Sequence, residues 1–233
     1  MWSAILIIAA VIATLIAYTA YGHHRHLAAS TGTSIDPASR PNTALLIIDF
    51  QEDFTTASAK QAYPPAAMES TLTAINALVE TANENGTPVI SVRQKFDGWY
   101  INLLVRLLNE GRGGASSDGL NLDARIDGDI DHDIVKSRAD AFHEEKLDRI
   151  LAQHGVGNLI VVGLDGEYCV NATITGALNR GYDVSFSDAT TLTLNSANWQ
   201  KVKSRLIAAG AKDGISLNHK PTKSDRAKEN EPA

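Results

Sequence analysis

The chain has 233 residues, of which 44% are hydrophobic and 21% charged, a composition that excludes an intrinsically disordered protein and fits one domain plus extra segments. The formal net charge is -6 and no stripe of Lys and Arg is present, so nucleic acid is not an expected partner. Cys169 is the only cysteine, which excludes an intramolecular disulfide scaffold.

The N-terminal segment differs from the rest of the chain. Residues 2–21 carry no charged side chain, and as a helix of about 1.5 Å per residue they reach about 30 Å, enough to cross a bilayer core. Trp2 lies at one end and Tyr18 and Tyr21 at the other, where aromatic belts occur. We therefore predict an uncleaved transmembrane anchor over residues 1–21. A cleaved signal peptide is the alternative; it is disfavoured because no Lys or Arg precedes the run and no clean small-x-small site follows it.

The charges that flank this segment indicate an orientation. Arg25 follows the segment closely, whereas only the terminal amine precedes it, so the positive-inside rule favours a single-pass protein with its main domain in the cytoplasm. His23, His24 and His26 show no tetrahedral partner set, and we interpret them as an interfacial patch rather than a metal site.

The remaining sequence alternates between strand and helix patterns after a predicted linker over residues 22–42. Short apolar runs predict strands at 43–50, 87–93, 133–136, 158–164 and 183–187, with a possible sixth at 214–217. Helical patterns lie at 66–85, 99–110, 144–154, 168–179 and 196–209. This alternation predicts an α/β fold with a three-layer, doubly wound, mostly parallel sheet and helices on both faces. The predicted hydrolase-type domain spans 43–217, and the polar residues 218–233 form a predicted disordered tail.

Three reactive side chains fall at the carboxyl ends of the predicted strands, where open α/β sheets place their sites. Asp49 ends the first strand, Lys136 ends the third, and Cys169 lies in the turn after the fourth, where a helix begins. A helix N-terminus and a nearby cation lower the pKa of a thiol, and a carboxylate can accept its proton. Backbone N–H groups in the turn of residues 163–169 can bind a developing oxyanion. We therefore interpret Cys169 as a nucleophile for acyl transfer.

Each of these residues also has a simpler interpretation. A lone cysteine is more often a small buried hydrophobe, and a strand-ending Asp is often a turn cap. Arg93 ends the second strand and is a candidate clamp for a substrate carboxylate, or equally a solvated charge. Trp99 and Tyr168 are candidate walls of a substrate pocket, or ordinary core and contact aromatics.

Three motif blocks carry a more specific signal. Residues 44–54 (ALLIIDFQEDF) are similar to an LLxIDxQxDF opening, residues 133–136 with 141–142 to a K…(S/D)AF block, and residues 163–173 to GxxTxxCVxxT. In this order they resemble the isochorismatase-like cysteine hydrolases, the superfamily of nicotinamidases and N-carbamoylsarcosine amidohydrolases. The resemblance implies a catalytic triad of Asp49, Lys136 and Cys169. It also implies a cis peptide bond between Leu164 and Asp165, oxyanion donors at the N–H groups of Asp165 and Cys169, and a homo-oligomer.

The sequence departs from that pattern in two places. The common Thr three residues before the cysteine is Gly166. No His lies between Asp53 and His132, so the Asp-x-His…His metal site of the nicotinamidases is missing, and we expect neither a metal nor an organic cofactor. Residues 122–126 (LDARI) are similar to the LDPRL block of generic hydrolases in the superfamily.

Together these features predict a membrane-anchored cysteine hydrolase that cleaves a C–N bond of a small amide or ureide through a thioester intermediate. One alternative is a vinyl-ether hydrolase of the isochorismatase type, which in the family can dispense with the cysteine. The other is a non-catalytic, membrane-tethered binding or scaffold protein on the same fold. The sequence does not indicate which small molecule is the substrate.

Overall fold

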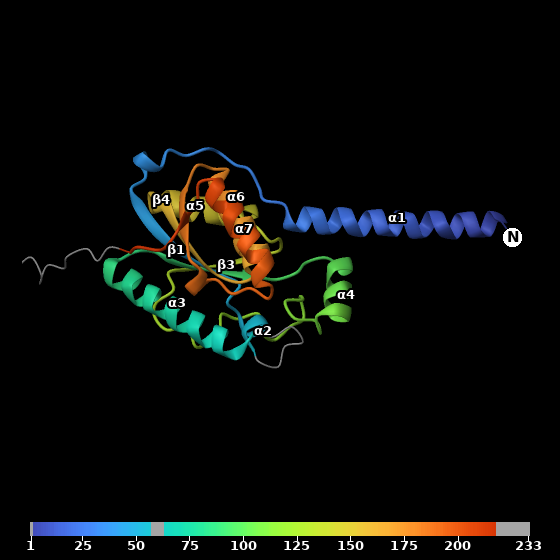
Figure 1. Ribbon diagram of the computed structural model, residues 1–233, viewed down its shortest axis with the longest axis horizontal. Coiled ribbons are helices and arrows are strands. Elements are labelled where there is room, and N and C mark those ends of the chain that lie inside the picture. Colours follow the sequence, from blue (N-terminus) through green and yellow to red (C-terminus); the bar gives the residue numbers. More distant parts are fainter. Residues whose placement is uncertain (1, 57–62, 218–233) are drawn as a thin grey trace, which may run out of the picture.

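The computed structural model describes residues 2–56 and 63–217, so the predicted tail at 218–233 lies outside the described residues. Its centre is a six-stranded sheet in the order β3-β2-β1-β4-β5-β6, in which every neighbouring pair of strands is parallel (Figure 1). The strands are β1 (Asn42–Ile48), β2 (Val89–Gln94), β3 (His132–Lys136), β4 (Val156–Gly163), β5 (Asp183–Phe186) and β6 (Lys212–Asp213). The predicted parallel α/β fold is confirmed.

Strand β1 lies in the middle of the sheet, and its apolar side chains suit a strand that is buried on both faces. Its residues from Ala44 to Ile48 are fully buried, because successive side chains of a strand point to opposite faces and both faces of this sheet are covered. Leu46 and Ile48 point into one hydrophobic cluster, and Leu45 and Ile47 point into the other. Fully burying each such side chain contributes about 1.5–3 kcal/mol.

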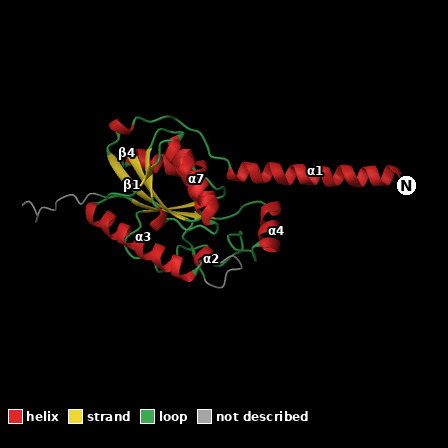
Figure 2. Ribbon diagram, viewed as in Figure 1, coloured by secondary structure: helices red, strands yellow, loops and turns green. Residues whose placement is uncertain are grey.

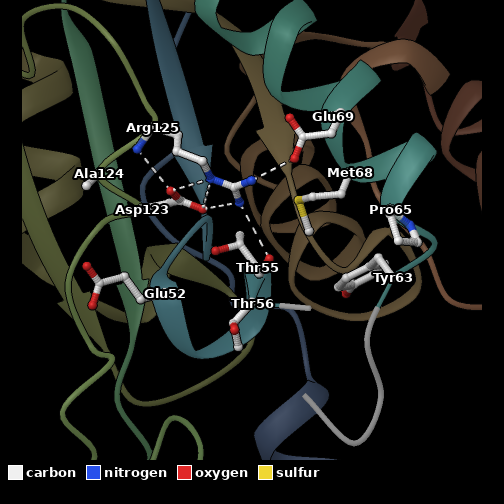
Figure 3. Close-up of a pocket in the computed structure, with 10 residues that line it drawn as sticks. All are labelled: Glu52, Thr55, Thr56, Tyr63, Pro65, Met68, Glu69, Asp123, Ala124 and Arg125. Carbon is white, nitrogen blue, oxygen red and sulfur yellow. Dashed lines mark hydrogen bonds and ion pairs between the residues drawn. The ribbon is translucent and has the colours of Figure 1, made fainter. Parts of the chain in front are cut away.

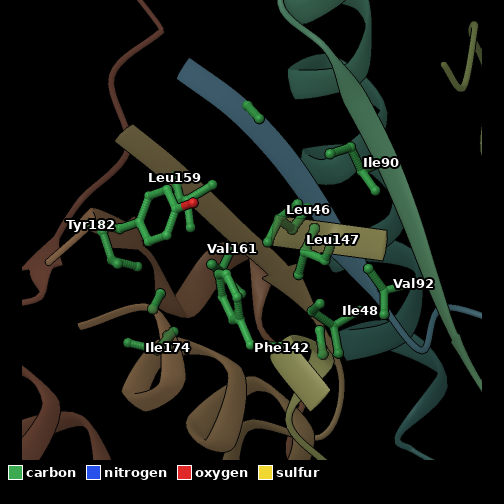
Figure 4. Close-up of a cluster of buried hydrophobic side chains, with 14 of the residues drawn as sticks. Leu46, Ile48, Ile90, Val92, Phe142, Leu147, Leu159, Val161, Ile174 and Tyr182 are labelled. Atoms are coloured by element: carbon green, nitrogen blue, oxygen red, sulfur yellow. The ribbon is translucent and has the colours of Figure 1, made fainter. Parts of the chain in front are cut away.

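Helices cover the two faces unequally. Helix α3 (Pro65–Asn85) covers one face with Leu72, Ile75 and Val79. Helices α5 (Glu145–Gln153), α6 (Asn171–Leu178) and α7 (Ser196–Ala208) cover the other. Figure 4 shows this second cluster, where Leu147 and Ile174 meet the strand side chains Leu46 and Val161. The sheet therefore has a core on each side, and its strand ends are left for a site.

The N-terminal helix is longer than the sequence predicts. Helix α1 spans Trp2–Leu27, so residues 22–27 of the predicted linker are helical. After α1 the chain runs along the domain, where the backbone N–H of Ser30 donates to Asp140 Oδ2 at 2.7 Å. Among the described helices, one is long and apolar enough to cross a membrane; its candidate span Ile5–Leu27 has a mean hydropathy of 2.2 and is not buried. Lack of burial excludes a core helix, whereas a signal sequence has the same properties.

Other elements also differ from their predicted bounds. The sixth strand is Lys212–Asp213 and not 214–217, because Gly214 turns the chain with a φ of 109°. A short helix, α2 (Glu52–Thr55), follows β1, and a π-helical turn over Gly166–Val170 precedes α6. Helix α4 (Trp99–Leu108) does not cover the sheet; it lies beside the domain end of α1 (Figure 2).

Candidate active site

The strand register brings four chain segments together at one edge of the sheet. Gln94, the last residue of β2, pairs in register with Lys136, the last residue of β3. Asp49 follows β1 directly, and the turn that carries Cys169 follows β4, the other neighbour of β1. The side chains of Asp49, Lys136 and Cys169 therefore meet, although 120 positions of sequence separate the first from the last (169 − 49).

The buried ion pair between Lys136 and Asp49 is the centre of the site. Lys136 Nζ donates to Asp49 Oδ2 at 2.9 Å and to Gln94 Oε1 at 2.7 Å, and Lys136 is fully buried. Burial raises the pKa of Asp49, an effect that the positive charge of Lys136 opposes. The negative charge of Asp49 holds the pKa of Lys136 above its ordinary value against the effect of burial. Each member of the pair therefore favours the ionised form of the other, in opposition to burial.

The backbone at Asp49 aims its carboxylate into the site. Asp49 has a φ of 52°, in the left-handed region, which Asp adopts more readily than most residues. Its N–H still donates to the carbonyl of Val92 at 2.8 Å, so the residue stays attached to β2. Since Oδ2 accepts from Lys136, Oδ1 is a buried acceptor with no N–H or O–H donor among the described residues, and the Cys169 thiol is the remaining side chain within hydrogen-bonding reach of this carboxylate.

The thiol of Cys169 is close enough to Asp49 and Lys136 to affect the pKa of both. Burial raises the pKa of this thiol well above its ordinary value; the charge of Asp49 raises it further, and Lys136 opposes the rise. Lys136 does lower this pKa, as expected, but burial and the charge of Asp49 outweigh it, so the net shift is upward. A thiol with a raised pKa becomes a nucleophile only if a neighbouring group accepts its proton.

A cavity of about 330 Å³ opens in front of Cys169. Its floor carries Asp49, Gln94 and Cys169, and its apolar walls include Phe96 and Leu164. Gln94 Nε2 is a buried donor without a partner among the described residues, because the other amide atom, Oε1, accepts from Lys136. The cavity thus offers a nucleophile, an acceptor and a donor to one small molecule.

The turn before Cys169 is held by the side chain of Asp165. The peptide bond between Leu164 and Asp165 is cis, at the position that the resemblance implies. The Asp165 carboxylate accepts from the N–H of Glu167 at 2.7 Å, from the N–H of Leu194 at 3.1 Å and from the Tyr63 hydroxyl at 3.2 Å. These bonds attach the turn to two other segments and orient it toward the cavity.

The departure at Gly166 has a steric explanation. A Cβ added at this position would lie 2.8 Å from the Trp199 ring and 3.0 Å from the Thr191 methyl group. Trp199 is buried on α7 and donates from Nε1 to Asp188 Oδ1 at 2.8 Å, so its ring is not free to move. Glycine at position 166 is therefore matched to the packing of Trp199.

Two of the predicted substrate-binding residues lie away from this cavity. The Arg93 guanidinium pairs with Asp133, with Nε 2.7 Å from Oδ1, because alternate residues of β2 face opposite sides and Gln94 takes the inner position. Trp99 is 75% exposed on α4 and lines a different cleft, beside α1. Tyr168 does reach the cavity and stands at its rim, 47% exposed.

The sequence-based prediction missed residues from two segments. Gln94 obeys the same strand-end rule as Asp49 and Lys136, and the alternation along β2 could have indicated it. His23, His26 and Leu27, at the end of α1, also line the cavity. The carbonyl of His26 accepts from the N–H of Ala139 at 3.0 Å, and no local pattern indicates this long-range contact. The histidines are therefore part of the cavity wall and not only an interfacial patch.

A second cavity, of about 440 Å³, lies beside the first (Figure 3). Arg125 Nη2 lies 2.6 Å from Asp123 Oδ2, and Arg125 Nη1 lies 2.7 Å from Glu69 Oε1. These ion pairs attach residues 122–126 to α3, and none of Asp49, Lys136 and Cys169 lines this cavity. We therefore assign the Arg125 cluster to the packing of this segment.

The described residues hold no cluster of three or more His, Cys, Asp or Glu side chains with the arrangement of a metal site. Asp53, the last acidic residue of the first motif block, has its carboxylate occupied by hydrogen bonds. Its Oδ2 accepts from the N–H of Gly113 at 2.6 Å, and its Oδ1 accepts from the Ser117 hydroxyl at 2.7 Å. Asp53 thus holds the loop after α4 against the cavity.

Comparisons with known proteins agree with this geometry. Residues 43–212 match the family described as "Isochorismatase domain". Streptothricin hydrolase from Streptomyces noursei is 31% identical over 166 residues, which cover 69% of this chain and 58% of that protein. A probable inactive nicotinamidase from Arabidopsis thaliana is 29% identical over 153 residues, covering 60% of this chain and 75% of that protein. The structure of a pyrazinamidase/nicotinamidase from Streptococcus mutans superposes with a TM-score of 0.64 at 22% identity, covering 74% of this chain and 99% of that one, which shows the shared fold.

Proposed function

The chain belongs to the isochorismatase family of hydrolases, and from this premise we propose that it is a membrane-anchored cysteine hydrolase acting on the C–N bond of a small amide or ureide. The observation that carries the proposal is the buried Asp49 carboxylate at the floor of the cavity, which reaches the Cys169 thiol and whose Oδ1 takes no N–H or O–H donor among the described residues. A scaffold protein has no need of a buried carboxylate oxygen without such a donor, which is costly in a folded protein.

In the first step, the thiol proton moves to Asp49 as Cys169 Sγ bonds to the substrate carbonyl carbon. Through its 2.9 Å contact, Lys136 opposes the effect of burial and favours the carboxylate form of Asp49. The N–H groups of Asp165 and Cys169 are the proposed donors to the oxyanion, and Gln94 Nε2 is an additional donor to the carbonyl or its substituent. When the tetrahedral intermediate collapses, the C–N bond breaks and the leaving amine takes the proton from Asp49.

In the second step, water attacks the thioester. Asp49 accepts a proton from the water as its oxygen bonds to the acyl carbon, and the bond from carbon to sulfur breaks. The proton then returns to the sulfur, so the acid product leaves and the thiol is restored. Every proton transfer in this mechanism uses Asp49, which requires that no other N–H or O–H donor occupies its second oxygen in the resting site.

The anchor in this proposal is α1. Its candidate span is apolar and unburied, as a bilayer-crossing helix requires, and Arg25 follows the aromatic residues Tyr18 and Tyr21. We propose a single-pass topology with the hydrolase domain in the cytoplasm.

The test uses the full-length chain in lipid nanodiscs and a panel of small primary amides, N-carbamoyl compounds and ureides, with release of ammonia or amine as the readout. Turnover by the wild type and an acyl adduct on Cys169, seen by intact-mass spectrometry after rapid acid quench, are the expected results. Cys169→Ala should abolish both, with unchanged thermal unfolding as its control. Turnover retained by Cys169→Ala, or hydrolysis confined to vinyl ethers in a parallel panel, would reject the mechanism.

A further inference from the structure

Helix α4 carries a stripe of large apolar side chains on its outer face. Trp99, Leu103 and Leu107 recur every four residues, so they lie on one face of the helix, and they are 75%, 47% and 66% exposed. Val105 points in nearly the opposite direction and is buried against the domain. Soluble monomers rarely leave such a stripe in water, so the outer face of α4 requires a partner.

The position of α4 relative to α1 indicates what that partner is. The ring of Tyr100 packs edge-on against Tyr18 with centroids 5.4 Å apart, and Trp99 lines a cleft together with Tyr18 and Thr19. At about 1.5 Å per residue, Tyr18 and Tyr21 lie about 24 and 29 Å from Trp2 along α1. If α1 crosses a hydrocarbon core of about 30 Å, α4 therefore begins at the level where the core meets the headgroups.

The direction of α4 also fits a position along the bilayer surface. Helix α4 runs across the direction of α1 and lies on the side of the domain from which α1 leaves (Figure 1). Because Val105 is buried, the opposite face of α4 is turned away from the domain. Arg106 is exposed beside Leu107, and Arg25 lies over the Tyr21 ring at 5.9 Å, so cations flank the apolar stripe at the level of phosphate groups.

We infer that α4 lies on the bilayer surface beside α1, with Trp99, Leu103 and Leu107 inserted among the lipid headgroups and upper acyl chains. The inference rests on the membrane anchor of the proposed function and is independent of the reaction. A lipid surface is favoured over a second copy of the chain because the apolar stripe continues the exposed apolar surface of α1 through the contact of Tyr18 with Tyr100.

This placement has a consequence for the catalytic cavity. The cleft between α1 and α4 and the cavity in front of Cys169 share His23, His26 and Ile101 in their walls. A bilayer-bound α4 therefore holds one side of the cavity at the headgroup level. Two helices, rather than one flexible tether, then determine the distance of Cys169 from the membrane.

The chain's own tryptophans allow a direct test. Trp199 is buried and hydrogen-bonded to Asp188, so in the Trp2→Phe variant Trp99 is the exposed tryptophan, and subtracting the spectrum of Trp2→Phe/Trp99→Phe isolates its signal. The full chain is reconstituted in vesicles of phosphatidylcholine and phosphatidylglycerol. The expected results are blue-shifted Trp99 emission, protection from acrylamide, and stronger quenching by lipids brominated near the headgroup than near the chain end.

Matched variants separate the stripe from the rest of α4. Leu103→Glu should reduce quenching of Trp99 by the shallow bromolipid at least two-fold, whereas Leu108→Glu, on another face of the helix, should not. Alkaline carbonate extraction distinguishes a failure of the membrane anchor from a failure of the α4 placement alone. Release of the chain rejects the anchor and with it this placement of α4. A retained chain with acrylamide-accessible Trp99 rejects the placement of α4 alone, as does a Trp99 shielded from both quenchers in a cross-linked dimer.

Discussion

Lys136 Nζ lies 2.9 Å from Asp49 Oδ2 in a position where Lys136 is fully buried and Asp49 is 2% exposed. Removing both charges from water is costly, and such a pair is a weak source of stability compared with apolar packing. In the proposed mechanism its value is chemical: Lys136 favours the charged form of a carboxylate next to a thiol, and that carboxylate accepts the thiol proton. Four experiments follow from this pair and its surroundings.

The Lys136→Met variant leaves Asp49 as an unpaired buried charge, so we expect a loss of about 3–5 kcal/mol in the free energy of unfolding at pH 8. Burial already raises the pKa of Asp49, and loss of Lys136 raises it further. The folded variant therefore takes up a proton on Asp49 at a higher pH than the unfolded chain does, and this uptake removes the buried charge as the pH falls. The loss should therefore be smaller at pH 5 than at pH 8. Denaturant unfolding in detergent measures both, and an equal loss at the two pH values would contradict the prediction.

The control for this variant is the double substitution Asp49→Asn/Lys136→Met. It removes both charges, so it should recover most of the stability lost by Lys136→Met while remaining inactive. Recovery of turnover in the double variant would show that the pair is not needed for the reaction.

The second prediction concerns the reactivity of Cys169. Burial and the charge of Asp49 raise the pKa of its thiol, so alkylation by iodoacetamide should be slow at pH 7 and should keep rising above pH 9 without a plateau. In Asp49→Asn the charge of Asp49 no longer raises the thiol pKa, while burial and Lys136 still act, so the thiol pKa should fall relative to the wild type and alkylation at pH 7 should accelerate about ten-fold for each pKa unit lost. Intact-mass measurement is unambiguous because Cys169 is the only cysteine. A wild-type plateau below pH 8, or slower alkylation of Asp49→Asn, would overturn this description of the site.

The reversed direction of the thiol pKa shows what the sequence can and cannot predict. Polar residues that end apolar strands of a parallel sheet must share an edge, so the meeting of Asp49, Lys136 and Cys169 follows from strand order and motif spacing. The sign of the thiol pKa does not follow, because it depends on how completely the surrounding chain excludes water. That quantity arises from packing between segments that are distant in sequence.

Two other misplacements have similar physical causes. Arg93 is predicted to face the substrate, but the next residue, Gln94, takes that position. In a strand, a shift of one residue moves a side chain to the opposite face. The last turn of α1, which residues 22–27 do not predict by themselves, makes a long-range contact in which the N–H of Ala139 donates to the carbonyl of His26. Side-chain direction and helix length thus came from tertiary contacts, whereas element order came from hydrophobic patterns.

The third prediction tests Gln94 as a donor to substrate. Gln94→Glu keeps an oxygen for Lys136 and removes the unpartnered Nε2, so kcat/KM should fall about 10²–10³-fold, as for loss of one preorganised donor. Gln51→Glu is the matched control. The Gln51 side chain bonds only to the N–H and carbonyl of Gln94 in the described structure, at 2.8 and 3.0 Å, so this change should mainly lower the unfolding temperature. Full activity in Gln94→Glu would remove Gln94 from the binding site.

The last prediction concerns the end of the anchor helix. His23 and His26 line the cavity that holds Cys169, whereas His24, on the same helical turn, is exposed and lines neither that cavity nor the cleft beside α4. In nanodiscs, His26→Ala should raise KM several-fold, because it removes a wall that packs against Phe96 with ring centroids 5.4 Å apart, while kcat changes little. His24→Ala should leave both parameters unchanged, and all variants should resist carbonate extraction equally. Equal kinetics for His24→Ala and His26→Ala would mean that α1 serves only as an anchor, and that the contact between its last turn and the cavity has no part in substrate binding.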